Sequence, residues 1–236
     1  MKKLLLIALV LLAVFTLTRS ERYSGRQKLT ITIETPAGEV SAASVSQVSW
    51  RKHWVQTDGM GWDYDLTGEA VVVEVTPAHY LFALLKGAGT TEYMGTVAAA
   101  SIVGRKGRVI DGALFDEVRD RNVRAAGGIT VPEYQYPMLV TFADITDPAR
   151  VQLVDPADLA ARFGPGVRLK SVVLEVTDEA VTEGVVEAVL RWIVQAKFIV
   201  PPEKQPRLMK DQTDEQMLMP SDFVDWLTLR AKRGAN

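Results

Sequence analysis

Hydrophobic and polar residues alternate along several short segments of the chain, and this pattern predicts β-strands. The clearest case is 28–34, KLTITIE, in which Leu29, Ile31 and Ile33 share one side while threonine and glutamate occupy the other. A period of two puts these apolar side chains on one face of a strand whose opposite face meets water. The sequence therefore predicts a sheet that is buried on one side.

The residues after this strand predict a hairpin. The next four residues, TPAG, form a turn, because Pro36 presets φ and Gly38 tolerates a positive φ. Residues 39–50 then return as a second strand. Most of its apolar residues share one phase, which Val45 breaks, so a bulge or bend is expected near Ala43–Ser46.

Five further segments have the composition and length of strands: 68–75, 78–86, 129–131, 136–145 and 167–177. Residues 78–86 are apolar in both phases, which fits either a buried strand or a short helix. Pro77 before this segment and Gly87 after it confine it to the length of a strand, so a strand is favoured.

Periodic apolar positions predict short helices at 91–103, 109–122, 155–164, 181–194 and 222–232. The third has the clearest boundaries, with Asp155 as N-cap, Pro156 in the first helical position and Gly164 after the last turn. Thr182 is the expected cap of the fourth. Residues 197–220 are rich in proline and have no periodicity, which predicts an extended arm.

Strands precede and follow the central helices, without regular βαβ alternation and without a repeat. The sequence therefore predicts an α+β fold: a mostly antiparallel sheet or sandwich with a few short helices, preceded by an N-terminal hydrophobic helix. The expected divisions are a signal peptide or membrane anchor at 1–20, a connector at 21–27, a single domain at 28–200, and an extended C-terminal arm with a short helix at 201–236.

The strongest compositional bias lies at the N-terminus. Lys2 and Lys3 precede an unbroken apolar run from Leu4 to Phe15, which is typical of a secretory signal. As a helix, residues 4–17 would span roughly 21 Å, which is short against a hydrocarbon core of roughly 30 Å. Cleavage after Ser20 and retention as an anchor both remain open. The expected location is the bacterial inner membrane with the domain in the periplasm, or the periplasm if the leader is cleaved.

Composition narrows the function classes. The chain has no cysteine, which excludes a lipid-modified cysteine, disulfides and thiolate metal sites. Hydrophobic residues make up 47% and charged residues 24%, as in a globular domain. The formal net charge of −2 argues against a nucleic-acid partner, which would favour a basic face.

Catalytic motifs are absent from the sequence. The two histidines, His53 and His79, do not form a short metal-binding motif, and neither a nucleophile elbow nor a phosphate-binding loop occurs. We therefore expect no metal and no cofactor, and the sequence identifies no catalytic residue. An active site of dispersed residues remains open, with His53 as the first candidate base.

The segment from 50 to 64 is the best candidate for a binding site. It contains three of the five tryptophans, with cationic residues between them. Aromatic faces beside cations bind sugars, acidic polymers or protein side chains. The candidate ligand-binding residues are Trp50, Arg51, His53, Trp54, Trp62 and Tyr64. The alternative is that these aromatic side chains cover the open end of the sheet.

Two stretches carry a resemblance to known sequences: KLTITIETPAGEV, and YPMLVTFADITDPARVQLVDPADLAARFGPGVRLKSVVLEVTDEAVT from Tyr136 onward. Together they resemble an uncharacterised group of short exported proteins from proteobacteria and their prophages. The resemblance implies export and a shared domain. The group has no assigned activity, so the resemblance implies no catalytic residue.

We therefore expect an exported protein of the bacterial envelope, most simply a non-enzymatic binding or structural protein. Its expected partners are the membrane, through the N-terminal segment, and a protein or polymer of the envelope. The alternative is a periplasmic hydrolase with a dispersed active site.

Overall fold

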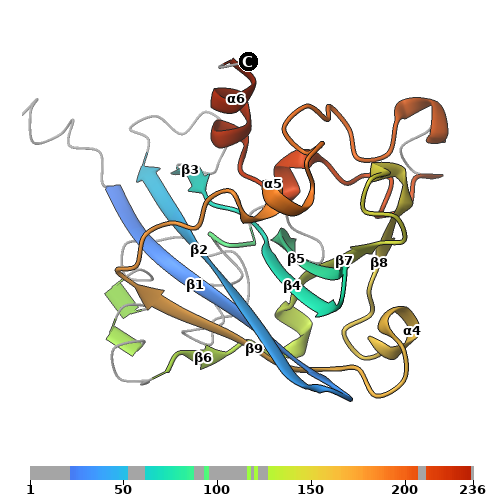
Figure 1. The fold of residues 1–236 in the computed structure, drawn as a ribbon. Coiled ribbons are helices and arrows are strands. Elements are labelled where there is room, and N and C mark those ends of the chain that lie inside the picture. Colours follow the sequence, from blue (N-terminus) through green and yellow to red (C-terminus); the bar gives the residue numbers. More distant parts are fainter. Residues whose placement is uncertain are drawn as a thin grey trace, which may run out of the picture.

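Two antiparallel sheets form the centre of the molecule (Figure 1). The computed structural model describes residues 22–52, 62–87, 93–95, 116–117, 120–121, 127–206 and 211–234, with only the backbone described for Arg22, Lys52, Trp62 and Asp63. Short helices and irregular segments surround the sheets. The coarse expectation of a sheet-rich α+β fold is therefore confirmed. The predicted N-terminal helix lies outside the described residues.

The first sheet has five strands in the order β3-β2-β1-β9-β6. Their bounds are β1 Arg22–Thr35, β2 Gly38–Lys52, β3 Trp62–Thr67, β6 Ile129–Thr130 and β9 Arg168–Thr177. The second sheet has four strands in the order β4-β5-β7-β8. Their bounds are β4 Val71–Thr76, β5 His79–Gly87, β7 Pro137–Phe142 and β8 Val151–Leu153.

The main hydrophobic core lies between the two sheets. Leu29, Ile31 and Ile33 of β1 are buried there, as their alternation predicts. Val71 and Val73 of β4 join the same core from the second sheet. Burial of such apolar surface is the main stabilising contribution to a sandwich of this kind.

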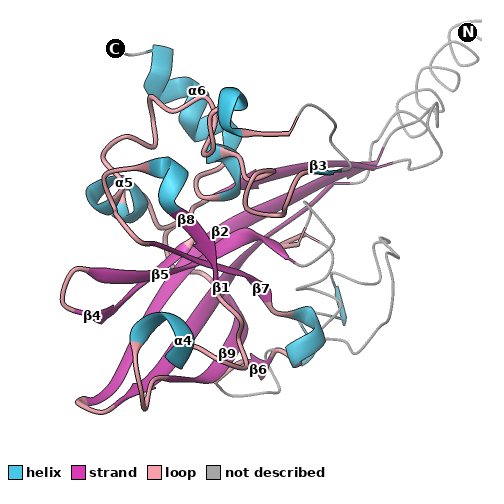
Figure 2. Ribbon diagram, turned by 90° about the vertical axis from the view of Figure 1, so that its right-hand side faces the viewer, coloured by secondary structure: helices cyan, strands magenta, loops and turns pink. Residues whose placement is uncertain are grey.

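A second core lies on the other face of the second sheet. The C-terminal segment covers this face with three short elements, α5 Val185–Val189, η5 Pro220–Asp222 and α6 Trp226–Gly234. Phe223 is fully buried there, with its ring centroid 5.8 Å from that of Phe82. The described residues at 211–234, part of the expected extended arm at 201–236, therefore fold back onto the domain (Figure 2).

The second core explains why β5 is apolar in both phases. Leu81, Ala83 and Leu85 face the main core, whereas Phe82 and Leu84 face the second. A strand covered on both faces has no reason to alternate. The preference for a strand over a helix in this segment is confirmed.

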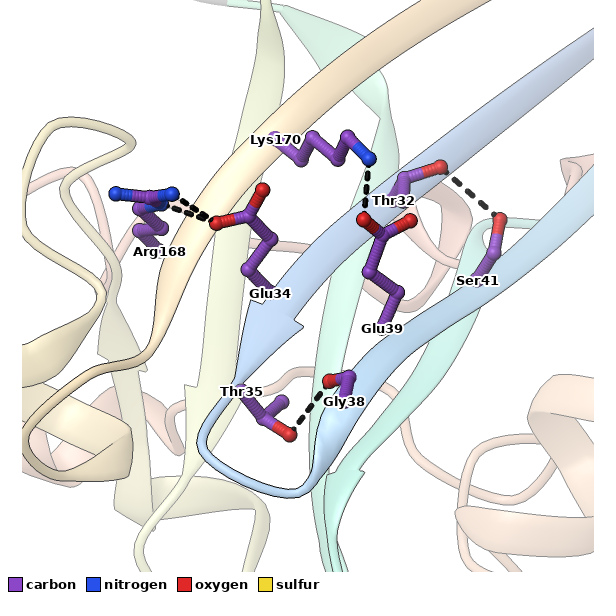
Figure 3. Close-up of polar contacts among 8 residues, drawn as sticks. All are labelled: Thr32, Glu34, Thr35, Gly38, Glu39, Ser41, Arg168 and Lys170. Atoms are coloured by element: carbon purple, nitrogen blue, oxygen red, sulfur yellow. Dashed lines mark hydrogen bonds and ion pairs between the residues drawn. The ribbon is translucent and has the colours of Figure 1, made fainter.

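The β1–β2 hairpin matches the sequence except at its bulge. The turn falls where expected, with Gly38 at φ 124°. The two strands pair one-to-one over their whole length, so the expected bulge in β2 is wrong. The register shifts instead between β1 and β9, where Lys170 is the extra residue. At this end of the sheet, Lys170 pairs with Glu39 and Arg168 with Glu34 (Figure 3).

The predicted helices start later than expected. Residues 155–158 form turns, and helix α4 spans Ala160–Phe163; Gly164 follows it as expected, at φ 99°. Thr182 caps no helix, since its hydroxyl accepts a hydrogen bond from Val45 N at 2.9 Å. Three further short helices are η1 Glu133–Gln135, η2 Pro148–Arg150 and η3 Pro202–Lys204.

Most of the two helices predicted at 91–103 and 109–122 lies outside the described residues. Tyr93–Gly95 form a turn, and residues 116, 117, 120 and 121 are helical. Within the part of the chain that the structure describes, no helix is both long and apolar enough to cross a membrane.

Candidate functional site

Two of the aromatic residues predicted to bind a ligand, Trp50 and Tyr64, lie at one end of the first sheet. Trp50 pairs with Tyr64 across β2 and β3, and their ring centroids are 4.7 Å apart. Trp50 is 2% exposed, whereas its neighbour Arg51 is exposed. Trp62 is described by its backbone alone, and the other two predicted residues, His53 and Trp54, lie outside the described residues.

A turn from elsewhere in the chain covers the Trp50–Tyr64 pair. A Cβ atom added to Gly95 would lie 2.3 Å from Tyr64 Cε2 and 2.7 Å from Trp50 Cζ2. The glycine is therefore needed for the turn to approach the two rings. Trp50 offers no free aromatic face to a ligand, and its position supports the alternative that it closes the end of the sheet.

The connection between the two sheets is a second polar region of the molecule. Gly68–Ala70 cross from β3 to β4, and their backbone groups bond to segments far away in sequence. Gly68 N donates to the Asp225 carboxylate at 3.0 Å, and Ala70 N donates to Phe223 O at 2.8 Å. These bonds join the C-terminal segment to the point where the chain changes sheets. We call Gly68–Ala70 and the groups bonded to it the junction.

The junction explains the small residues of β2. Ser44 Oγ donates to Glu69 O at 2.6 Å, and a Cβ on Gly68 would lie 2.5 Å from Ser46 Oγ. Larger side chains at these positions would push the crossing chain away from β2. Both serines therefore share the inward phase of the apolar residues in this strand.

Glu69 is the central side chain of the junction. It is 3% exposed, and its carboxylate accepts hydrogen bonds from Gly184 N at 3.1 Å, Val185 N at 2.8 Å and Val186 N at 3.3 Å. These donors are the backbone N–H groups at the start of α5, where a helix supplies no acceptor of its own. Burial raises the pKa of Glu69, and the three donors oppose that shift. A single acidic residue before an apolar strand was the only sign of this role in the sequence.

A cleft of about 670 Å³ lies beside the second sheet. Its lining comes from η1, the start of β7, the end of β8, the segment leading into α4, α4 itself and Asp214. We call its apolar lining residues the floor: Tyr136, Pro137, Met138, Leu139, Leu153, Val154, Pro156 and Ala161. A volume of this size lies within the range of about 300–1,000 Å³ that is usual for ligand pockets.

Charged residues surround this floor. Four exposed carboxylates and one exposed guanidinium form the rim of the cleft, giving the rim a formal net charge of −3: Glu133, Asp155, Asp158, Asp214 and Arg162. Arg162 Nε donates to the Leu153 carbonyl at 3.2 Å, so the guanidinium is directed to the backbone of the sheet edge. Burial raises the pKa of Tyr136, and the negative charge of Glu133 raises it further by a smaller amount.

Backbone hydrogen bonds fix two of the rim carboxylates. Asp155 Oδ1 accepts from Ala157 N at 2.9 Å, and Asp158 Oδ1 accepts from Ala161 N at 3.1 Å. Each bond leaves lone pairs of the same carboxylate for other donors. The sequence pattern marked this segment as a helix start, and gave no sign that it borders a cleft.

The described lining of the cleft contains no histidine, serine, threonine or lysine. Over the described ranges of the chain, no group of three acidic or histidine side chains is placed to hold a metal ion. His79 is exposed in the β4–β5 hairpin, with Nδ1 3.2 Å from Thr76 Oγ1. The hydrolase alternative stays a prediction, because its candidate base, His53, lies outside the described residues.

Comparison with known proteins identifies no relative of this chain. No family model, no curated protein and no solved structure matches the chain.

Proposed function

We propose that this chain is a non-enzymatic binding protein that takes a cationic, partly apolar ligand into the cleft beside β7 and β8. The observation that carries the proposal is the combination of an apolar floor with a rim of formal charge −3. The floor favours apolar groups through burial, and the rim favours positive charge through electrostatic attraction.

A peptide segment that mixes lysine or arginine with apolar residues fits both features. Long basic side chains lay their methylene stems on apolar surface and keep the charged group at the edge. Exposed Glu133 and Asp214 lie at this edge, on separate elements of the fold. A cationic segment in the cleft would therefore reach carboxylates from more than one side.

The proposal includes export from the cytoplasm. The basic start and apolar run at residues 1–17 support it, as does the resemblance to short exported proteins. The protein would then act in the bacterial envelope, on the outer side of the inner membrane, either tethered by the N-terminal segment or released after cleavage. Mass spectrometry of the mature N-terminus separates these two forms.

Calorimetric titration of the full chain tests the binding proposal. The probe is a short synthetic peptide of alternating lysine and leucine, compared with a peptide of alternating glutamate and leucine. The double variant Glu133→Gln/Asp214→Asn should bind the lysine peptide about tenfold more weakly, because two attractive charges are lost. Asp178→Asn removes an exposed charge that does not line the cleft and should leave the affinity unchanged. Equal binding of both peptides to the unmodified chain would contradict the proposal.

A further inference from the structure

Helix α6 presents large apolar side chains to water. Trp226 is 55% exposed and its neighbour Leu227 is 48% exposed. Leu229, by contrast, is buried in the second core and attaches the helix to the domain. Two adjacent large apolar residues exposed on an ordered helix are a feature of surfaces that bind a partner.

Hydrogen bonds on both sides hold α6 in this position. Asp225 Oδ1 accepts from Thr228 N at 2.9 Å at the start of the helix. Near its end, Lys232 forms an ion pair with Glu187, and Arg233 Nε donates to Val194 O at 2.6 Å. The exposure of Trp226 therefore belongs to a helix that is fixed to the rest of the protein.

The chemistry of the exposed face fits the surface of a lipid bilayer. The Arg230 guanidinium lies 5.1 Å from the centroid of the Trp226 ring, so a cation accompanies the aromatic group. Tryptophan concentrates at the boundary between lipid tails and headgroups, where its ring is half in each environment. A neighbouring arginine adds attraction to anionic headgroups.

The position of α6 points to the same partner. The beginning of β1 and helix α6 both lie at the upper end of the molecule, whereas the β1–β2 turn lies at the lower end (Figures 1 and 2). The chain reaches β1 directly after its apolar leader. At this end of the sheet the register pairs Arg22 with Arg51, and the acidic positions of β3 there pair with β2, Asp63 with Arg51.

We propose that Trp226 and Leu227 form a second membrane contact, which inserts into the interface of an anionic bilayer and holds the domain with its α6 end against the membrane. This inference rests on the proposed membrane segment at residues 1–20. In this orientation the β1–β2 turn points away from the lipid.

The absence of native cysteines allows a direct test on the full chain. Leu227→Cys and, as a matched control, Ala37→Cys in the exposed β1–β2 turn are each labelled with the same environment-sensitive fluorophore. Both proteins are reconstituted into vesicles of phosphatidylcholine with phosphatidylglycerol, with and without quencher groups on the lipid tails. We expect at least about twofold quenching at position 227 and none at 37, because an interfacial helix buries its apolar face below the headgroups.

Two measurements separate this inference from the proposed membrane segment. Flotation with the vesicles reports attachment of the chain, and quenching reports contact by α6. Flotation without quenching at position 227 would overturn the second contact and leave the membrane segment intact. Loss of flotation would overturn both. Equal quenching at positions 227 and 37 would overturn the orientation.

Discussion

The junction and the cleft both contain carboxylates, but the junction carboxylate is buried and hydrogen-bonded, whereas those around the cleft are exposed. At the junction, Glu69 is buried and receives three backbone donors. Around the cleft, Glu133 and Asp214 are exposed on a rim whose negative charges exceed its positive charge. A buried and saturated carboxylate specifies a fold, because its donors have no other partner. Excess negative charge on a rim favours the binding of a cationic ligand more than it stabilises the fold.

Removing the Glu69 carboxylate should have the largest effect on stability. Glu69→Ala leaves the backbone N–H groups of Gly184, Val185 and Val186 without their acceptor. The bond from Val186 N is buried, and those from Gly184 N and Val185 N are partly buried. A buried donor without a partner costs about 1–3 kcal/mol, so we expect a total loss of about 2–3 kcal/mol. Urea unfolding at neutral pH measures it.

Glu69→Gln is the matched control for this change. The amide keeps one oxygen acceptor and nearly the same volume, so it should lose clearly less stability than the alanine variant. A loss below about 1 kcal/mol for Glu69→Ala would mean that water replaces the carboxylate at the start of α5.

The pH dependence of stability should identify Glu69 as a titrating group. Burial raises its pKa above the ordinary value of 4.5. A carboxyl group whose pKa is higher in the folded state stabilises the fold fully below its unfolded pKa, and loses this contribution as the pH rises through the folded pKa. The stability of the unmodified protein relative to Glu69→Gln should therefore fall as the pH rises from 4.5 through the higher pKa of the folded state.

Urea unfolding of both proteins across this range measures the difference. A relative stability that rises with pH would show that the three N–H donors outweigh burial, so that the folded protein prefers the ionised carboxylate.

The contrast between junction and cleft also separates what the sequence reveals from what it does not. Alternation in β1 predicted its buried face, and the proline–glycine turn predicted the hairpin. These features depend on neighbours in sequence. The bulge at Lys170 could not be located, because it depends on the register with β1. Residues 197–220 carried no periodic signal, although Ile199 and Leu218 are buried in the second core.

The sites were harder to predict than the strands. A concentration of tryptophan suggested a binding surface near Trp50, but this side chain is buried in the main core, where the Tyr93–Gly95 turn approaches its ring. The cleft is formed by segments that are distant in sequence, from Glu133 to Asp214. One of its acidic residues, Asp155, had a local explanation as a helix cap. Only the tertiary arrangement shows that they surround one apolar floor.

Removing charge from the rim should have the smallest effect on stability. Glu133→Gln/Asp214→Asn changes two exposed side chains in a region of surplus negative charge. We expect the free energy of unfolding to stay within about 0.5 kcal/mol of the unmodified protein, because exposed substitutions of this kind rarely cost more. Urea unfolding beside Glu69→Ala provides the comparison within one experiment. A loss approaching that of Glu69→Ala would assign the rim carboxylates to the fold, and any weaker peptide binding by this variant would then reflect damage to the domain.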